Sequence, residues 1–329
     1  MDPKNTFLSC DWGTSSFRLL LVERHTLAVL AQVSSKEGNA AIAKSWQQAN
    51  QPPGQRLSFY LAIVQPHLQQ LEQSVQMSLK GVPLVISGMA SSTIGMEELP
   101  YKPLPFATDG ADLQTKYTPS AASFEHPILL ISGVKSEDDV MRGEETQLVG
   151  CELGNTPQRQ LFLHPGTHTK HVLVQQGQAV ALKTYMTGEF FSLLSKESIL
   201  ASSVEEGGQL EEGNNQHWFA KGLQDSQQAN LLHHAFLVRT QDLFRKASRQ
   251  ENYFYLSGLV IGCECQDLVR SLPAGIVLAG KPVLVAQYSA ALRVLGIADK
   301  VPVDVKNGEE VTIKGQWTVL RKSQIKEEA

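Results

Sequence analysis

The feature that most constrains the fold of this 329-residue chain is one turn that recurs at half-chain spacing. The stretch DWGTSSFRLLLVE, which begins at Asp11, contains the end of one apolar run, a turn at Gly13 and a second apolar run. HPGTHTKHVLVQQ, which begins at His164, repeats this order around Gly166. A period of about 20–50 residues would predict a solenoid. A period of nearly half the chain instead predicts two domains of one fold, which face each other across a cleft.

The composition is that of a soluble globular protein with enough apolar residues for two cores, since 42% of the residues are hydrophobic and 19% are charged. The formal net charge is −4 and there is no long basic block, so neither nucleic acid nor an anionic membrane surface is an expected partner. The apolar run from Phe17 to Glu23 is far too short to span a bilayer. We therefore expect a cytoplasmic protein that does not bind membranes.

Apolar runs and their spacing predict strands and helices in both halves of the chain. We expect strands over residues 6–10, 17–23, 27–33, 83–89, 127–134, 160–166, 170–176, 179–186 and 275–280. We expect helices over residues 56–80, 138–152, 189–200, 217–249, 253–272 and 283–295. Residues 91–122 are rich in Pro, Gly and Ser, which predicts a long functional or mobile loop. The turn-forming residues 154–157 predict a domain boundary.

The recurring turn has the chemistry of a phosphate-binding site. Backbone N–H groups and hydroxyls at Gly13, Thr14 and Ser15 can converge on one anion, as in other backbone nests. Asp11, at the end of the preceding strand, can hold Mg²⁺ through water, because Mg²⁺ keeps most of its hydration. One such turn taken alone is better explained as a tight hairpin, in which Gly, Thr and Ser are common. Two copies, of which one begins with Asp11 and the other contains Lys170, favour a polyphosphate site.

The segment GIVLAGKP, from Gly275 to Pro282, nearly matches the P-loop pattern of nucleotide-binding proteins. Pro282 stands where that pattern has Ser or Thr, and it has neither a hydroxyl for Mg²⁺ nor an N–H for phosphate. The apolar residues between the two glycines predict a strand and not a loop. We therefore reject a P-loop, and expect Ala279 and Gly280 at the strand end to pack against an adenine ring, since glycine permits close approach.

The segment MRGEETQLVG supplies candidate catalytic carboxylates. Glu144 and Glu145 follow Arg142 and Gly143 at the predicted start of a helical run. Paired carboxylates beside an arginine suit a general base or a metal site. Acidic residues in a first helical turn also stabilise the helix dipole, and the segment taken alone does not distinguish these roles.

These motifs together resemble the superfamily of sugar kinases, hexokinase, hsp70 and actin. DWGTSSFR resembles its first phosphate motif, HPGTHTKHV its second, and GIVLAGKPVLVAQY its adenosine motif. The closer resemblance, over nearly the whole chain, is to the 2-dehydro-3-deoxygalactonokinase family, through SGMASSTIGMEELPY, VMRGEETQLVG, TYMTGEFFSLL and YFYLSGLVIGCE. It implies transfer of the ATP γ-phosphate to the 6-hydroxyl of 2-dehydro-3-deoxygalactonate in galactonate breakdown. It also implies an α/β fold of two ribonuclease H-like (actin-like ATPase) domains, residues 1–153 and 154–329. Each domain would be a mixed five-stranded sheet with flanking helices, and the two would face each other across a nucleotide cleft.

The resemblance implies roles for individual residues. Glu144 stands where broader sugar kinases have a catalytic Asp, so Glu144 is the candidate base and Glu145 the alternative. Asp11 matches the carboxylate associated with Mg²⁺. The implied ATP-binding and phosphate-binding residues are Gly13, Thr14, Ser15, Arg18, Gly166, Thr167, His168, Lys170, Ala279 and Gly280. The substrate's carboxylate and hydroxyls are assigned to Gly88, Met89, Ser91, Gly95, Lys102 and Arg142. The last 25 residues depart from the family, which has a helix of small residues against the nucleotide domain.

Three alternatives remain open at this point. A phosphohydrolase of the superfamily would direct water onto ATP or polyphosphate with the same turns. A kinase for another 2-keto-3-deoxy sugar acid, such as the gluconate form, would act on a substrate that differs at one hydroxyl. A non-catalytic actin-like assembly protein would polymerise with ATP. The expected partners are the sugar acid and ATP with Mg²⁺, and a homodimer is left open.

Overall fold

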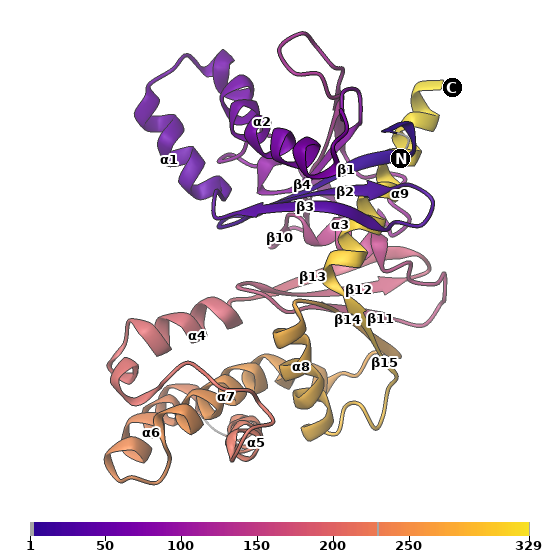
Figure 1. Ribbon diagram of the computed structural model, residues 1–329. Coiled ribbons are helices and arrows are strands. Elements are labelled where there is room, and N and C mark those ends of the chain that lie inside the picture. Colours follow the sequence, from indigo (N-terminus) through magenta and orange to yellow (C-terminus); the bar gives the residue numbers. More distant parts are fainter. Residues whose placement is uncertain (1–2, 229, 329) are drawn as a thin grey trace. The chain divides into compact units, whose positions relative to one another are not determined.

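The computed structural model describes residues 3–228 and 230–328, which divide into two compact units (Figure 1). The first unit contains the residues up to Asn155, Gln176–Leu182 and the residues from Glu309 on. The second contains Thr156–Gln175 and Lys183–Gly308. The expected boundary near residues 154–157 coincides with the first of these divisions. We expected all residues after 153 to form one domain, but the C-terminal helix and Gln176–Leu182 belong to the first unit.

The first unit is built on a mixed sheet whose strand order is β3-β2-β1-β4-β8-β7. The central strand β1 pairs antiparallel with β2 and parallel with β4, and β4 pairs parallel with β8. The sheet has six strands where five were expected, because β7 adds to its edge by antiparallel pairing with β8. These strands are β1 (Thr6–Trp12), β2 (Phe17–Glu23), β3 (Val29–Ser35), β4 (Leu84–Gly88), β7 (Thr115–Thr118) and β8 (Ile128–Ile131).

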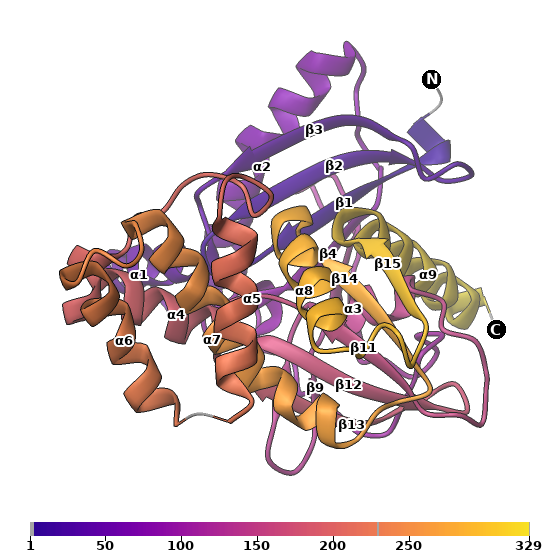
Figure 2. The same cartoon turned by 90° about the horizontal axis from the view of Figure 1, so that it is seen from below.

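Helices cover both faces of this sheet (Figures 1 and 2). Side chains alternate along β1, so Leu8, Cys10 and Trp12 enter the core with α2 (Arg56–Val75), beside which lies α1 (Asn39–Ala49). On the opposite face Phe7 stacks on Trp317 of α9 (Gly308–Glu328), with ring centroids 5.5 Å apart. Asp11 therefore lies on the α9 face of the sheet.

The second unit repeats the same pairing pattern. Its strands β15-β14-β11-β12 lie in this order, with β11 antiparallel to β12 and parallel to β14, as β1 is to β2 and β4. The half-chain repeat therefore corresponds to a repeated topology. The strands are β11 (Gln160–His164), β12 (Thr169–Gln175), β14 (Gly275–Gly280) and β15 (Val303–Asn307). Strand β13 (Gln178–Tyr185) is divided, because the boundary between units falls after Leu182.

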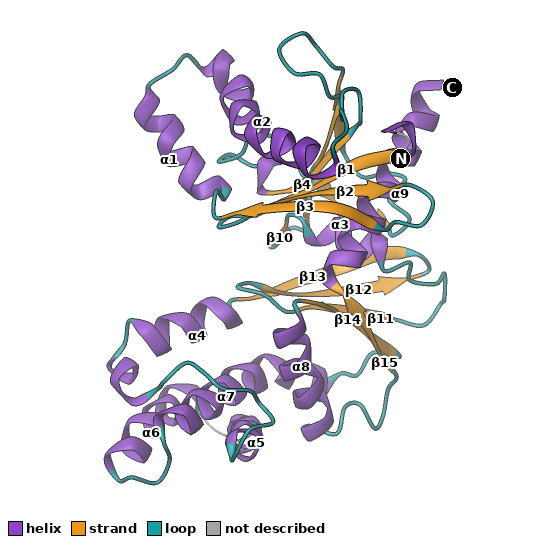
Figure 3. Ribbon diagram, viewed as in Figure 1, coloured by secondary structure: helices purple, strands orange, loops and turns teal. Residues whose placement is uncertain are grey.

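The helices of the second unit, shown in purple in Figure 3, are mostly those expected. They are α4 (Thr187–Lys196), α5 (Asn215–Ser226), α6 (Leu231–Leu243), α7 (Arg249–Arg270) and α8 (Pro282–Val294). The prediction of a single helix over residues 217–249 was wrong, because α5 and α6 are separate helices. The Asn230 side chain caps α6 by accepting a hydrogen bond from the Leu232 N–H, which starts a new helix there.

Two further expectations in the first unit need correction. The helix expected from residue 138 begins only at Glu144, as α3 (Glu144–Gly150), because Gly143 has a φ of +112° that a helix cannot include. The loop expected over residues 91–122 contains short strands besides β7. The remaining elements are β5 (Lys102–Pro103), β6 (Phe106–Ala107), β9 (Val134–Lys135), β10 (Val140–Met141), and the 3₁₀ turns Pro3–Asn5, Pro53–Gln55, Met89–Ser91 and Ile199–Ser203. Among the described helices, none is long and apolar enough to cross a membrane.

Helices α3 and α9 cross at two glycines. A Cβ at Gly150 would lie 1.8 Å from the Val311 carbonyl oxygen, and a Cβ at Gly315 would lie 1.9 Å from the Thr146 carbonyl oxygen. The Gln316 amide, next along α9, donates to the Cys10 carbonyl and the Ser87 hydroxyl, so α9 also holds β1 and β4. The C-terminal helix thus carries small residues where it meets α3, although its sequence departs from the family elsewhere.

We expect Gly315→Ala to destabilise the protein by about 1–3 kcal/mol, because the methyl group overlaps backbone that cannot move alone. This loss should exceed the roughly 1 kcal/mol that alanine gains over glycine in a helix. Chemical unfolding of the purified protein measures the change. Gly154→Ala is the matched control, since a Cβ there has no atom within 4 Å. Equal stability of the two variants would contradict the crossing as described.

Candidate active site

The first candidate phosphate turn connects β1 to β2 and is held by the start of α1. The Gly13 N–H donates to the Ser16 carbonyl at 2.9 Å, which closes the turn, and Thr14 and Ser15 are exposed. The Asn39 N–H donates to the Gly13 carbonyl at 3.0 Å. A Cβ at Gly38 would lie 2.3 Å from the Thr14 carbonyl oxygen, so only glycine permits this approach. The turn is therefore fixed by backbone contacts, with its hydroxyl side chains directed to solvent.

The second candidate turn connects β11 to β12 and is held by α4 in the same way. A Cβ at Gly188 would lie 2.4 Å from the Gly166 carbonyl oxygen, and the Glu189 N–H donates to the Thr167 carbonyl at 3.0 Å. The His168 ring forms a hydrogen bond with the Glu189 carboxylate. Each unit thus has a glycine at the helix that follows its third apolar run, and that glycine packs on the turn. Gly38 and Gly188 were not predicted from the sequence, although both copies contain a glycine at this position.

Asp11, Gly88 and the start of α3 lie close together in the first unit. Asp11 is partly exposed near the end of β1, in register with Arg18 on β2 and Ser87 on β4. Gly88 has a φ of +93°, and a Cβ there would lie 3.5 Å from Asp11 Oδ1. A Cβ at Gly143 would lie 3.3 Å from the Gly88 Cα. The predicted metal residue, a predicted substrate residue and the predicted base segment are therefore neighbours.

The two glutamates at the start of α3 have different environments. Glu145 is fully buried, and its carboxylate accepts the Gly143 N–H at 2.8 Å and the Thr146 hydroxyl at 3.2 Å. Burial, and then the neighbouring Glu144 carboxylate, raise the pKa of Glu145 to about 8. Glu144 is partly exposed, and its Oε2 accepts the Arg142 N–H at 2.9 Å. Glu144 is thus the more accessible of the two carboxylates.

The predicted substrate segment from Gly88 to Gly95 is a closed loop tied to Arg142. The Arg142 guanidinium donates to the Ser91 carbonyl at 2.6 Å and lies 4.1 Å from the centroid of the Tyr101 ring. Ser91 is buried, and Met89 is partly exposed. A Cβ at Gly95 would lie 2.1 Å from the Ala90 carbonyl oxygen, so glycine is needed to close the loop. Lys102 lies on β5 and pairs with Asp112 at 2.9 Å.

The predicted basic residues of both turns have protein partners. Arg18 forms a 2.9 Å ion pair with Glu309 in the first turn of α9. Lys170 is in register with His164 and only 6% exposed, and its ammonium donates to the Thr184 hydroxyl at 3.0 Å. The phosphate role of Arg18 and Lys170 stays a prediction.

The predicted adenosine segment lies beside the second turn. Ala279 and Gly280 are the last residues of the fully buried strand β14, and α8 begins two residues later, so GIVLAGKP forms no P-loop. The His164 Nδ1 donates to the Ala279 carbonyl at 2.8 Å. A Cβ at Gly280 would lie 3.4 Å from the Pro165 carbonyl oxygen. The strand end and the turn thus share one edge of the second unit's sheet.

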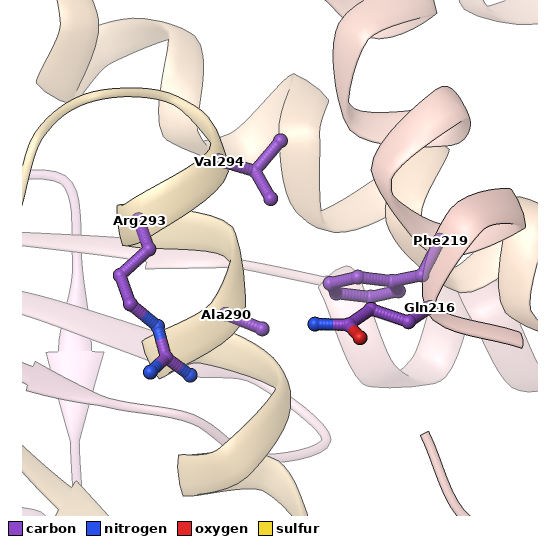
Figure 4. A pocket seen from close by; sticks show the side chains of 5 residues that line it. All are labelled: Gln216, Phe219, Ala290, Arg293 and Val294. Atoms are coloured by element: carbon purple, nitrogen blue, oxygen red, sulfur yellow. The ribbon is translucent and has the colours of Figure 1, made fainter. Parts of the chain in front are cut away.

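A hollow of about 290 Å³ in the second unit lies away from this edge (Figure 4). It lies between α5 and α8 and is lined by Gln216, Phe219, Ala290, Arg293 and Val294. Arg293 and Val294 end α8, whereas the second turn and Gly280 are near its start. None of the predicted site residues lines this hollow.

The donor set fits Mg²⁺ bound together with a polyphosphate. No three His, Cys, Asp or Glu side chains in the described ranges are grouped so that they could hold a metal ion by themselves. Mg²⁺ does not require such a group, because it binds through one or two carboxylates, several waters and the oxygens of a phosphate ligand. A single partly exposed carboxylate, Asp11, satisfies the protein's share of this coordination.

The repeated topology, with a Gly-Thr turn at the end of each unit's first strand, defines an actin-like ATPase of the sugar-kinase type. A sequence model described as 2-keto-3-deoxy-galactonokinase matches residues 11–319. The chain therefore belongs to the 2-keto-3-deoxy-galactonokinase family, as its motifs predicted.

Named relatives support this assignment. The chain is 29% identical over 297 residues to "probable 2-dehydro-3-deoxygalactonokinase DgoK1" of Rhizobium meliloti (strain 1021). This match covers 88% of this chain and 90% of that protein. It is 32% identical over 224 residues to the 2-dehydro-3-deoxygalactonokinase of Escherichia coli (strain K12), covering 65% and 71%. A crystal structure of a candidate 2-dehydro-3-deoxygalactonokinase from Sinorhizobium meliloti is similar with a TM-score of 0.77 at 28% identity, over 96% of both chains.

The raised pKa of Glu145 predicts a pH-dependent stability. The unfolded chain ionises this group near its ordinary pKa of 4.5, whereas the folded protein retains the proton until about pH 8. Any stability that Glu145 contributes is therefore complete below about pH 4.5 and is lost as the pH rises through 8. We expect the unfolding free energy of the wild type to fall, relative to Glu145→Gln, by up to about 1.4 kcal/mol per pH unit in this window.

Urea unfolding of both proteins at several pH values between about 5 and 8 measures this difference. Equal denaturant m-values are the control that both proteins expose the same surface on unfolding. Parallel stability curves across the window would show that Glu145 titrates as it does in the unfolded chain.

Proposed function

We propose that the chain transfers the γ-phosphoryl group of ATP to the 6-hydroxyl of 2-dehydro-3-deoxygalactonate in galactonate catabolism. The observation that carries the proposal is the convergence of Asp11, Gly88 and the start of α3, in a chain that the family's sequence model matches from residue 11 to 319. The names of the relatives supply the substrate. A cytoplasmic location follows from the proposal, since ATP is the phosphoryl donor.

Phosphoryl transfer depends mainly on positioning and on neutralising charge, and the residues divide these tasks. We assign phosphate binding to the N–H groups and hydroxyls of the turns at Gly13 and Gly166. Asp11 would hold Mg²⁺, which supplies positive charge to the phosphate oxygens when it is bound. We assign to Glu144 the role of accepting the proton of the attacking hydroxyl, because it is the partly exposed member of the α3 pair. Its carboxylate is oriented by the hydrogen bond from the Arg142 N–H.

The closed loop from Gly88 to Gly95 is the proposed sugar-acid side of the site. Its conformation is set by its own backbone bonds, such as Gly95 N–H to the Ser92 carbonyl at 2.8 Å, and by Arg142. A loop of this kind presents its polar groups without paying an ordering entropy on binding. The Arg142 guanidinium contacts the loop and the Arg142 backbone N–H contacts Glu144, so the loop and the candidate base are linked through one residue.

A substrate panel tests the proposed function directly. ATP consumption with 2-keto-3-deoxy sugar acids should be fastest with the galactonate form, slower with the gluconate form, and negligible with ATP alone. Activity should be lost with EDTA and restored by Mg²⁺. Phosphate release without any sugar acid would indicate a phosphohydrolase, and ATP-dependent polymerisation without sugar phosphate would indicate an assembly protein. Either result would overturn the proposal.

We expect Glu144→Gln to lower kcat by about 10²–10⁴-fold, because the hydroxyl proton loses its acceptor. Nucleotide affinity should change little, since phosphate binding is assigned to the turns. Steady-state kinetics and calorimetric titration with MgADP measure the two effects. Glu152→Gln is the matched control, because Glu152 follows the other end of α3 and pairs with Lys314 at the surface. Near-wild-type turnover of Glu144→Gln would exclude this residue as the base.

A further inference from the structure

A buried carboxylate of the second unit, Glu264 at the end of the segment YFYLSGLVIGCE, has a hydrogen-bonding role that the resemblance did not assign. Glu264 lies on α7, and its side chain is only 1% exposed. A buried carboxylate is costly unless several donors satisfy its oxygens. Such a group is expected to hold its donors in place as firmly as they hold it.

Glu264 accepts hydrogen bonds from three different elements. Its Oε1 accepts from the His171 Nε2 of β12 at 2.8 Å. Its Oε2 accepts from the Tyr288 hydroxyl of α8 at 2.6 Å and from the Thr187 hydroxyl at the start of α4. Burial, and then the Glu264 charge, raise the pKa of Tyr288 well above its ordinary value, so its hydroxyl remains a donor.

These donors belong to the segments that hold the second phosphate turn, Gly166 to His168. Thr187 directly precedes Gly188, the glycine whose Cα packs against the Gly166 carbonyl. Thr169, the first residue after the turn, bonds to the Tyr288 hydroxyl at 3.0 Å. One carboxylate is thus connected to the helix that packs on the turn and to the strand that leaves it.

We propose that Glu264 is a positioning residue that fixes the second phosphate turn against the start of α4, and thereby sets the affinity for the nucleotide phosphates. The inference rests on the proposed function, because it takes this turn as a phosphate ligand. Carboxylate chemistry is required at this position. An amide of the same size offers one accepting oxygen in place of two, and its NH₂ group faces donors.

The test is Glu264→Gln, measured by calorimetric titration with MgADP and by steady-state kinetics. We expect the Kd for MgADP and the KM for ATP to rise about tenfold, as for the loss of a hydrogen bond to a charged group. The KM for the sugar acid should be unchanged. Asp267→Asn is the matched control, since Asp267 lies one turn further along α7 and accepts from Tyr185 and Lys183, neither of which donates to Glu264. This control should bind MgADP as the wild type does.

Thr187 provides a second, milder test in case Glu264→Gln folds poorly. Thr187→Val removes one donor at nearly constant volume and should weaken MgADP binding without changing the KM for the sugar acid. Thr187→Ser restores the hydroxyl and should recover the affinity. In the double variant Thr187→Val with Glu264→Gln, the two losses should be less than additive, because both break one network.

Several outcomes would overturn the inference. These are wild-type MgADP affinity in Glu264→Gln, equal losses in Glu264→Gln and Asp267→Asn, or an equal rise in both KM values. A wild type that binds MgADP but phosphorylates no sugar acid would overturn the proposed function alone, and the MgADP comparison would still decide the role of Glu264.

Discussion

The contact on which each candidate phosphate turn depends is a backbone carbonyl packed against a glycine at the start of a helix. Thr14 has this contact with Gly38, and Gly166 has it with Gly188. A side chain at either position would overlap the turn. Because both residues are glycine, the helix start can approach closely enough for its N–H groups to bond to turn carbonyls. The turn is thereby fixed before any ligand binds. Its remaining N–H groups and hydroxyls are free of the need to stabilise the turn itself.

The same kind of contact positions the candidate base in the first unit. Gly88 and Gly143 lie against each other beside Asp11, and Gly150 and Gly315 allow α3 to cross α9 in backbone contact. A seven-residue helix such as α3 has little stability of its own. Its position is therefore set by these glycine contacts and by the buried Glu145, whose carboxylate bonds to the Gly143 N–H. The partly exposed Glu144 is thus oriented by a segment that these contacts hold in place.

Much of the fold could be predicted from the sequence, because the relevant signals are local. Strand-length apolar runs and the repeat of Gly13 at Gly166 predicted the repeated topology. Pro282 and the apolar residues before Gly280 excluded a P-loop. The break between α5 and α6 was missed, because a single side chain, Asn230, starts the second helix. The membership of α9 in the first unit was also missed. It depends on contacts between residues far apart in the sequence, such as that of Gln316 with Cys10.

The candidate site follows the same division. Asp11 and the two turns are contiguous motifs, so their positions could be predicted, and the resemblance named Glu144 and its alternative. Burial was needed to separate Glu144 from Glu145, because adjacent residues in a sequence show no difference in exposure. Glu264 ends the quoted segment YFYLSGLVIGCE, but its hydrogen-bonding role could not be predicted. Its importance comes from three partners, on β12, α8 and α4, that only the tertiary fold brings to one carboxylate.

The two copies of the turn carry different charges, although each joins an antiparallel pair of strands. In the first copy the residue that precedes the turn is Asp11, aligned with the exposed Arg18, whose charge is balanced by Glu309. In the second copy the corresponding pair is His164 and Lys170, and Lys170 is almost completely buried. An exposed carboxylate near bound phosphates is tolerable only where a cation lies between them. Under the proposed function, we therefore assign the metal to the first copy, and direct backbone contact with phosphate to the second, which lacks a carboxylate at this position.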